Sequence, residues 1–231
     1  MKKAQKVCFT VGITLLISAL SLCLYNIRED KTGGEQAETV LQKIKTEVPA
    51  VSEILSGSSP PEKKYDLFAE YETESTPEEA VIQVENDSYI GMIYIPELET
   101  ELPVMSEWSY PNLKVSPCRY QGSYLEDNMI IAAHNYRSHF GRIGELHSGS
   151  EIIFTDASGK IWNYQVDNIE TVSGTDISAM EAGSDENWDL TLFTCNLSGQ
   201  SRVTVRAVRM EESTSTTLTS FAKKWGLVTI R

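Results

Sequence analysis

Near the end of the chain, a short loop separates a cysteine from an arginine in a pattern that suits chemistry. Residues 190–195, Leu-Thr-Leu-Phe-Thr-Cys, are rich in β-branched and apolar types, which is typical of a short buried strand. Residues 196–201 are polar or small and include a glycine, which indicates a turn. Residues 202–206 alternate again between apolar and polar types. Because the last residue of one hairpin strand lies beside the first residue of the next, we expect Cys195 and Arg202 to be neighbours.

This pair suits nucleophilic catalysis. The thiolate is the reactive form of cysteine, and a nearby guanidinium favours it. Arginine also offers a fork of donors for a developing oxyanion. The simpler interpretation of Cys195 is a small buried apolar side chain, the common state of a free cysteine. Arg206 lies on the same strand face as Arg202 and is its alternative.

A catalytic cysteine also needs a proton carrier, and His134 is the best candidate. It ends the apolar run 129–133, so a strand would hold its ring in place. The alternatives, His139 and His147, lie in polar loop sequence. His134 is remote from the cysteine in sequence, but a β-fold can bring the two together.

At this point the residues resemble a family. Residues 191–195, Thr-Leu-Phe-Thr-Cys, resemble the TLxTC signature of sortases, the cysteine transpeptidases of Gram-positive cell surfaces. In that family a histidine ends an upstream strand and an arginine opens the strand after the cysteine, and His134, Cys195 and Arg202 match these positions. Residues 89–96 and 102–104 resemble the "G-x-(I/L)-x-IP…PV" opening of sortase domains. The resemblance covers roughly residues 89–210.

The resemblance implies an activity. A surface protein with an LPxTG-like C-terminal sorting signal would dock, Cys195 would form a thioacyl-enzyme, and an amine from a peptidoglycan precursor or a pilin would resolve it. Arg202 would stabilise the oxyanion, and His134 would protonate the leaving amine. Thr194 matches a threonine that lines the substrate groove, and Asn135 would help to shape the pocket. Two alternatives stay open: a surface cysteine peptidase that uses water, and a non-catalytic binding module with the same fold.

Composition and charge limit the partners. The formal net charge of −13 argues against a nucleic-acid surface, which needs clustered lysines and arginines. No Cys-x-x-Cys pair or histidine cluster indicates zinc, so we expect no metal and no cofactor. Some class A sortases bind calcium, but the acidic loop residues here, such as Glu145, Glu151 and Asp176, show no calcium-loop spacing. Cys118 and Cys195 are one possible disulfide pair, but a nucleophile must stay free.

The N-terminal segment predicts a membrane anchor. Residues 7–25 hold no charged residue, and as a helix rising about 1.5 Å per residue they span roughly the hydrocarbon core. Lysines precede the run and Arg28, Glu29 and Asp30 follow it, which favours a cytoplasmic N-terminus over residues 1–6. We therefore expect a single-pass signal-anchor over residues 7–27 in the cell membrane, with an extracellular catalytic domain. A cleaved signal peptide is the alternative, but no A-x-A site follows the run.

Beyond the anchor, the sequence predicts a spacer and one domain. Residues 28–85 read as an extracellular spacer, with a short amphipathic helix within 38–54 that the Ser/Gly/Pro-rich run 56–61 ends. The catalytic domain covers residues 86–212, and 213–231 form a C-terminal tail. Many short strands with turn signals predict a mainly β fold, a barrel or a sandwich. The resemblance implies an eight-stranded β-barrel with a few short helices.

The element pattern is specific enough to be tested. We expect strands over residues 89–95, 101–105, 129–133, 151–155, 161–166, 190–195 and 202–206. We expect helical turns within 110–115 and 140–146, and loops over 118–123 and 170–188. The stretch from 166 to 189 is too short for the helical insertion of class B sortases, which favours a class A- or D-like domain. Residues 116–121, however, depart from the glycine-rich stretch common in class A.

Overall fold

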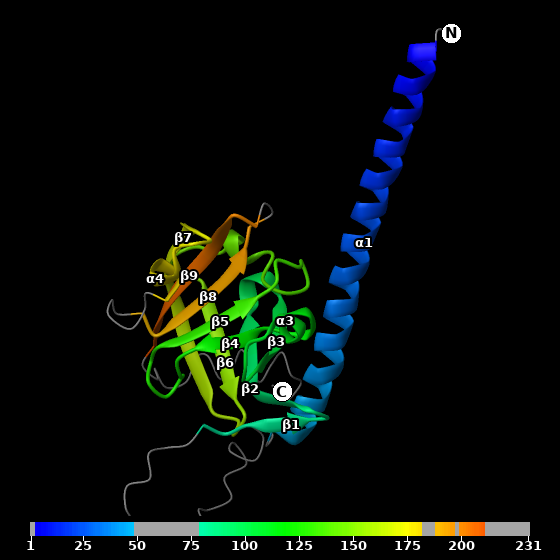
Figure 1. The fold of residues 1–231 in the computed structure, drawn as a ribbon. Helices are drawn as coiled ribbons and strands as arrows, with labels where there is room; N and C mark the ends of the chain where they lie inside the picture. The colour runs from blue at the N-terminus through cyan, green and yellow to red at the C-terminus, as the bar shows by residue number, and fades with distance from the viewer. Residues whose placement is uncertain (1–2, 49–78, 182–187, 197–198, 211–231) are drawn as a thin grey trace, which may run out of the picture.

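A long helix and a closed sheet make up the part of the chain that the computed structural model describes, residues 3–48, 79–181, 188–196 and 199–210 (Figure 1). Nine strands form the sheet: β1 (Ile82–Val84), β2 (Asp87–Ile95), β3 (Thr100–Met105), β4 (Cys118–Gln121), β5 (Met129–Ala133), β6 (Glu151–Asp156), β7 (Ile161–Ser173), β8 (Leu190–Cys195) and β9 (Ser201–Arg209). The helices are α1 (Lys3–Glu47), α3 (Tyr110–Val115) and α4 (Ile177–Glu181), with short 3-10 turns η2 (Pro96–Leu98) and η3 (Ile143–Glu145).

The sheet closes into a barrel of eight strands. Its order is β1-β2-β3-β4-β5-β8-β9-β7-β6, and β6 pairs back with β2, so that β2 to β9 complete the ring while β1 extends from β2. Gly91 lies where β2 pairs with both β3 and β6. Its φ is 152°, and a Cβ there would lie 2.1 Å from the carbonyl oxygen of Thr155, so only glycine fits this closure. The predicted eight-stranded barrel is confirmed.

Strand alternation divides the apolar side chains into two layers. Ile131, Leu192 and Val205 point into the barrel, where they belong to the main core. Their neighbours Ile130 and Phe193 point outward and pack in a second layer, together with residues of α1. The barrel wall is therefore buried on both faces at β5 and β8, which explains why both strands read as nearly continuous apolar runs.

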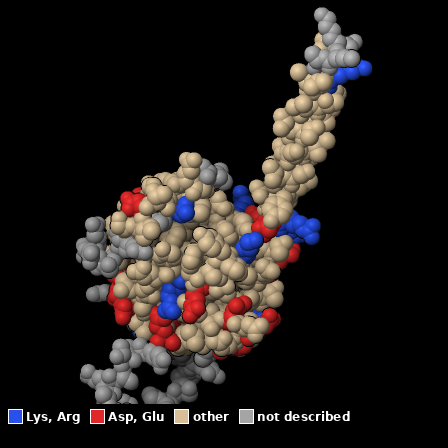
Figure 2. Space-filling view, viewed as in Figure 1, with Lys and Arg blue, Asp and Glu red and all other residues tan. Residues whose placement is uncertain are grey.

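The first part of α1 is an exposed apolar helix. Figure 2 shows basic side chains at its far end and then no charged side chains until it reaches the barrel, where charges of both signs gather. An 18-residue window has a mean hydropathy of 2.4, so this helix is long and apolar enough to cross a membrane, by length and composition. This segment includes the predicted anchor over residues 7–27.

The second part of α1 differs from the expected spacer. Residues 28–47 continue the same helix, and its buried residues Ala37, Leu41 and Ile44 follow the helical spacing and pack on the barrel. Lys45 forms an ion pair with Glu101 of β3 at 2.9 Å. The rest of the expected spacer, residues 49–78, and the expected tail, 213–231, lie outside the described residues.

The remaining elements follow the expected pattern, apart from α4 within the expected loop 170–188 and three differences among the strands. The strands around the cysteine and the histidine, the helix over Tyr110–Val115 and the turn η3 lie where they were expected. The first difference is that Cys118–Gln121, expected as a loop, is strand β4. The second is that β7 continues to Ser173, because its second half pairs with β9 while its side chains stay largely exposed and polar. The third is that β1 begins the sheet at Ile82, before the expected domain start.

Candidate active site

Three adjacent strands bring the candidate catalytic residues together at one rim of the barrel. Strands β5 and β8 run parallel, and Ala133 is paired with Thr194. His134 and Cys195 are the next residues on these two strands, so both leave the sheet at the same edge. Strand β9 returns antiparallel beside β8, and its register pairs Cys195 with Arg202. The hairpin pairing expected from the sequence is confirmed.

The three residues also share the outer face of the barrel. Phe193 packs in the outer layer, so Cys195, two residues further along β8, points the same way. Ala132 belongs to the same outer layer, which places His134 on that face as well. Arg202 is opposite Cys195 in an antiparallel pair, and opposite residues share a face. We call this arrangement of His134, Cys195 and Arg202 the catalytic rim.

Cys195 is a half-buried free thiol at the start of the β8–β9 loop. The loop is closed by a hydrogen bond from the Asn196 amide to the Ser201 carbonyl oxygen at 2.9 Å. Asn135 donates from its side chain to the Asn196 carbonyl oxygen at 3.4 Å, which links the loop after β5 to the loop after β8. Asn135 therefore lies beside the residue that follows the cysteine.

His134 is half-buried, and its ring stacks on Tyr136 with the ring centroids 4.7 Å apart and the planes 26° from parallel. Burial lowers the pKa of His134, and the positive charge of Lys114 lowers it further, while Glu29 acts in the opposite direction. The imidazolium form of this residue is therefore a stronger acid than a free histidine would be.

The Arg202 side chain is folded back on its own hairpin. Its Nη1 donates to the carbonyl oxygens of Gly199, at 3.0 Å, and Ser201, at 3.2 Å. A guanidinium carries five N–H donors, so these two bonds do not exhaust its fork.

Thr194 is buried and points into the barrel. Its hydroxyl donates to the Ala133 carbonyl oxygen at 2.9 Å, which ties β8 to β5 just below the rim. Because the side chain faces away from Cys195, a substrate contact of Thr194 would have to come from its backbone.

The alternatives considered from the sequence lie in other environments. His139 is fully buried, whereas His147 is exposed and lies 3.2 Å from a Glu97 carboxylate oxygen. Arg206 is buried, donates to the Thr191 hydroxyl at 3.1 Å and lies over the Trp188 ring. Arg206 also donates to the Ala179 carbonyl oxygen, so it holds α4 and Trp188 against the sheet.

The other barrel cysteine is also a free thiol. Cys118 is fully buried, and burial raises its pKa to about 12. Cys118 and Cys195 are therefore not joined in a disulfide. Among the described residues, no three His, Cys, Asp or Glu side chains gather in the way that a metal site requires.

The structure adds Tyr136 to the residues singled out from the sequence. It lies two positions after His134 in a loop whose sequence gives no period, so its contact with the imidazole depends on tertiary packing. The signal available in the sequence was an aromatic residue two positions after the candidate catalytic histidine, which could have indicated a ring contact. Tyr136 also contacts α1, as described below.

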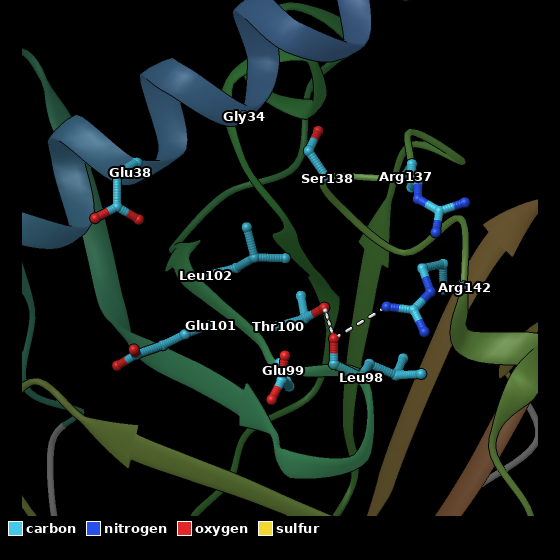
Figure 3. A pocket seen from close by; sticks show the side chains of 10 residues that line it. All are labelled: Gly34, Glu38, Leu98, Glu99, Thr100, Glu101, Leu102, Arg137, Ser138 and Arg142. Atoms are coloured by element: carbon cyan, nitrogen blue, oxygen red, sulfur yellow. Dashed lines mark hydrogen bonds between the residues drawn. The ribbon is translucent and has the colours of Figure 1, made fainter. Parts of the chain in front are cut away.

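A cavity lies beside this region, between α1 and the barrel. It has a volume of about 300 Å³ and is lined by residues of α1, η2, β3 and the loop after β5 (Figure 3). The picture shows Glu38 of α1 on one side and Arg137 and Arg142 on the other, with Arg142 bonded to the Leu98 carbonyl oxygen. Among the described residues, its lining includes neither His134 nor Cys195, so it is separate from the catalytic rim.

With this geometry in view, comparison with known proteins identifies the class. The family model of the sortase domain matches residues 93–210, about half of the chain. The chain therefore belongs to the sortase family, whose members are cysteine transpeptidases. A search of curated proteins found no match.

Solved sortase structures are similar to this chain. A sortase D5 transpeptidase of Clostridium perfringens is 22% identical, with a TM-score of 0.47 over 53% of this chain and 79% of that chain. Sortase A of Corynebacterium diphtheriae, as a lid mutant, is 21% identical, with a TM-score of 0.49 over 56% of this chain and 74% of that chain. Sortase C of Clostridium perfringens SM101 is 21% identical, with a TM-score of 0.46 over 77% of this chain and 90% of that chain.

Proposed function

We propose that this protein is a membrane-anchored sortase that cleaves an LPxTG-like sorting signal and transfers the surface protein to an amine. The observation that carries the proposal is the register at the catalytic rim. The parallel pairing of β5 with β8 and the antiparallel pairing of β8 with β9 put a thiol, an imidazole and a guanidinium on one face. These are a nucleophile, a proton carrier and an oxyanion donor, the three roles that acyl transfer needs.

The chemistry proceeds in two halves. The Cys195 thiolate attacks the carbonyl carbon of the signal's threonine, and the Arg202 guanidinium stabilises the oxyanion. The threonine–glycine C–N bond then breaks, the His134 imidazolium gives its proton to the leaving nitrogen, and a thioester remains. An amine attacks the thioester, its proton passes to His134, and the new amide leaves with the thiolate restored.

The charge state of His134 matters for this cycle. The first half needs the imidazolium and the thiolate together, and each charge favours the other. Burial and Lys114 lower the pKa of His134, so the proton is released readily, while the charged form is less populated at neutral pH. Glu29 favours the charged form from the side of α1.

The N-terminal helix supports the rest of the proposal. Its apolar part is long enough to span a bilayer, and basic residues precede it in the sequence. Basic residues before the span favour a cytoplasmic N-terminus, which would put the catalytic domain outside the cell. Surface proteins with a sorting signal, and the amine of a cell-wall precursor or a pilin, are found there. The substrate's peptide would reach Cys195 at the end of β8, where the side chain is half-buried.

The test is a cleavage assay with the full chain and a peptide that contains an LPxTG-like signal. We expect the wild-type protein to cleave the peptide, and to form an amide when a glycine peptide is added as the amine. Cys195→Ala should lose both activities, because the thioester forms on this sulfur. Cys118→Ala is the matched control and should retain them, since Cys118 is buried away from the rim.

Two outcomes would change the assignment. Cleavage retained by Cys195→Ala would exclude the proposed mechanism. Cleavage by the wild type that gives only the hydrolysed product, whatever the amine added, would instead indicate a cysteine peptidase.

A further inference from the structure

The first turn of α1 beyond the predicted membrane segment contacts the loop that follows His134. The Tyr136 hydroxyl donates to a Glu29 carboxylate oxygen at 3.0 Å. The Asp30 carboxylate accepts the backbone N–H groups of Arg137, at 3.2 Å, and Ser138, at 3.1 Å, and the Ser138 hydroxyl at 2.6 Å. Burial opposes ionisation of Asp30, but the hydrogen bonds from Ser138 and Arg137 outweigh it and lower its pKa.

Tyr136 connects this turn to the catalytic rim. Its ring stacks on the His134 imidazole at 4.7 Å between centroids, and the His139 ring lies 5.4 Å away. On the side of α1, a Cβ built on Gly33 would lie 3.2 Å from the Tyr136 ring, so a residue with a side chain would push against it. The ring is therefore held between the helix backbone and the imidazole.

This contact is separate from the apolar packing that docks α1 on the barrel. The apolar docking surface includes Leu41 and Ile44, and the ion pair of Lys45 with Glu101 lies beside it. The cavity of Figure 3, lined by Gly34 and Glu38, lies between this surface and the turn at residues 29–33. Because the apolar surface already holds the helix, the polar turn acts mainly on the loop of Tyr136 and Ser138.

We propose that Tyr136 is a positioning residue for His134 and that Glu29 and Asp30 of α1 hold it in place, so that the anchor helix sets the orientation of the catalytic imidazole. The proposal rests on the proposed function of His134. It differs from a purely structural role because Tyr136 and the Glu29 carboxylate of α1 act on the pKa of the imidazole in opposite ways. The Tyr136 ring covers it from water, while the Glu29 carboxylate favours its charged form.

Several charged or titratable groups lie around His134, and the direction in which each one changes the pKa of the imidazole defines the test. Those from α1, α3 and the loop after β5 are Glu29, Lys114, Tyr136 and His139, and the strand register puts Cys195 and Arg202 on the same face of the barrel. Removal of the Tyr136 ring exposes the imidazole, which should raise its pKa toward the ordinary value. Removal of the Glu29 charge should lower its pKa further. A general loosening of the loop would instead raise the pKa in both variants.

The experiment uses the full chain in detergent micelles with isotope-labelled histidine, and titrates His134 by NMR in the wild type, Tyr136→Ala, Tyr136→Phe and Glu29→Gln. We expect an upward shift for Tyr136→Ala, a downward shift for Glu29→Gln, and a smaller change for Tyr136→Phe, which keeps the ring but releases Glu29. Glu35→Gln is the matched control, because Glu35 lies on the same helix and pairs only with Lys31 among the ion pairs of the described residues. It should leave the titration unchanged.

The same proteins are assayed for cleavage of the sorting peptide. Tyr136→Ala should lower kcat by roughly 10- to 100-fold with little change in KM, because a misplaced catalytic group affects the chemical step more than binding. Tyr136→Phe should recover most of this loss, since it restores the stacked ring.

The outcomes separate this inference from the proposed function. If Tyr136→Ala cleaves with the wild-type kcat and titrates as the wild type does, Tyr136 does not position His134 and the inference is overturned. Equal upward shifts in Tyr136→Ala and Glu29→Gln overturn it as well. If no version of the chain cleaves a sorting peptide, the proposed function fails, and the titrations alone decide whether α1 sets the environment of His134. If Tyr136→Ala does not fold, the direction of the shift in Glu29→Gln, a change at a partly exposed carboxylate, decides the inference.

Discussion

Two regions of this barrel carry the same pair of residue types in opposite environments. The catalytic rim has Cys195 and His134, both half-buried at the ends of parallel strands. On the side of the barrel that α1 covers, Cys118 and His139 are both fully buried, Cys118 in the layer that packs on Leu41 and His139 next to Gly33. Burial raises the pKa of Cys118 to about 12 and lowers that of His139 to about 4, so both stay neutral over the physiological range.

The difference in burial between the two regions shows what a cysteine or histidine needs for acid–base or nucleophilic chemistry. In the covered layer, desolvation favours the neutral form and no ionic chemistry is available. At the rim, Arg202 lies opposite Cys195 in the strand register, and the thiol and the imidazole are only half-buried, so both side chains reach solvent. Position at a strand end, rather than residue type, distinguishes the half-buried pair, for which we propose a catalytic role, from the fully buried pair.

Alkylation should show the largest contrast. A thiol with a pKa of about 12 is ionised on the order of 10³-fold less than an ordinary one, so Cys118 should resist iodoacetamide in the folded protein. Cys195 should be modified under the same conditions. Peptide mapping by mass spectrometry, before and after denaturation, measures both sites. Equal labelling of the two cysteines in the folded chain would remove the distinction between the regions.

Two arginines on strand β9 give the next contrast. Arg202→Gln should lower kcat for peptide cleavage by about 10²- to 10³-fold without loss of stability, because it removes the proposed oxyanion donor from a partly exposed hairpin. Arg206→Gln should mainly lower the resistance to urea, because Arg206 is buried against Thr191 and Ala179. Steady-state kinetics and urea titration are measured on both variants. The contrast fails if Arg202→Gln retains wild-type kcat.

Acid stability should show the smallest and most gradual effect. The pKa of His139 is lowered in the folded state, so between the two pKa values the unfolded chain binds a proton at this residue and the folded chain does not. Its contribution is complete above the unfolded value of about 6.5 and is lost as pH falls toward 4, at up to about 1.4 kcal/mol per pH unit. His139→Leu should flatten the slope of urea-unfolding free energy in this window. His147→Gln, at an exposed site, is the control, and an identical slope in His139→Leu and wild type would contradict the prediction.

The hairpin of Cys195 and Arg202 was predictable because its signals are local. Alternation, a glycine-containing loop and a strand end together define its register. The strand of His134 was likewise visible as an apolar run. The parallel pairing of this strand with the cysteine strand was not, since it joins residues 61 positions apart. The resemblance to sortases supplied that step, and the catalytic roles themselves stay predictions.

The elements that sequence reasoning missed depend on tertiary contacts. The second half of β7 is polar because its side chains are exposed, so its pattern resembles a loop although its backbone pairs with β9. Gly33 and Gly34 lower the helix propensity of α1, yet they allow it to approach Lys114 and Ser138 closely. For Tyr136 the only local signal is its closeness to His134 in sequence, because its position is set by a helix that begins more than a hundred residues earlier.

The continuity of α1 limits how far the barrel can move from the membrane-spanning segment that we propose. The helix has no break between its apolar part and the turn that contacts Tyr136, and Glu29 lies two residues, or about 3 Å of helix, beyond residue 27. If residues 7–27 span the bilayer as proposed, the Cys195 sulfur would be held at a fixed height close to the headgroups. A domain on a flexible linker could bind substrates over a range of distances from the membrane. A domain held by a continuous helix would bind only substrates that come close to the lipid headgroups. Donor and acceptor would then meet by diffusion in two dimensions, along the plane of the membrane.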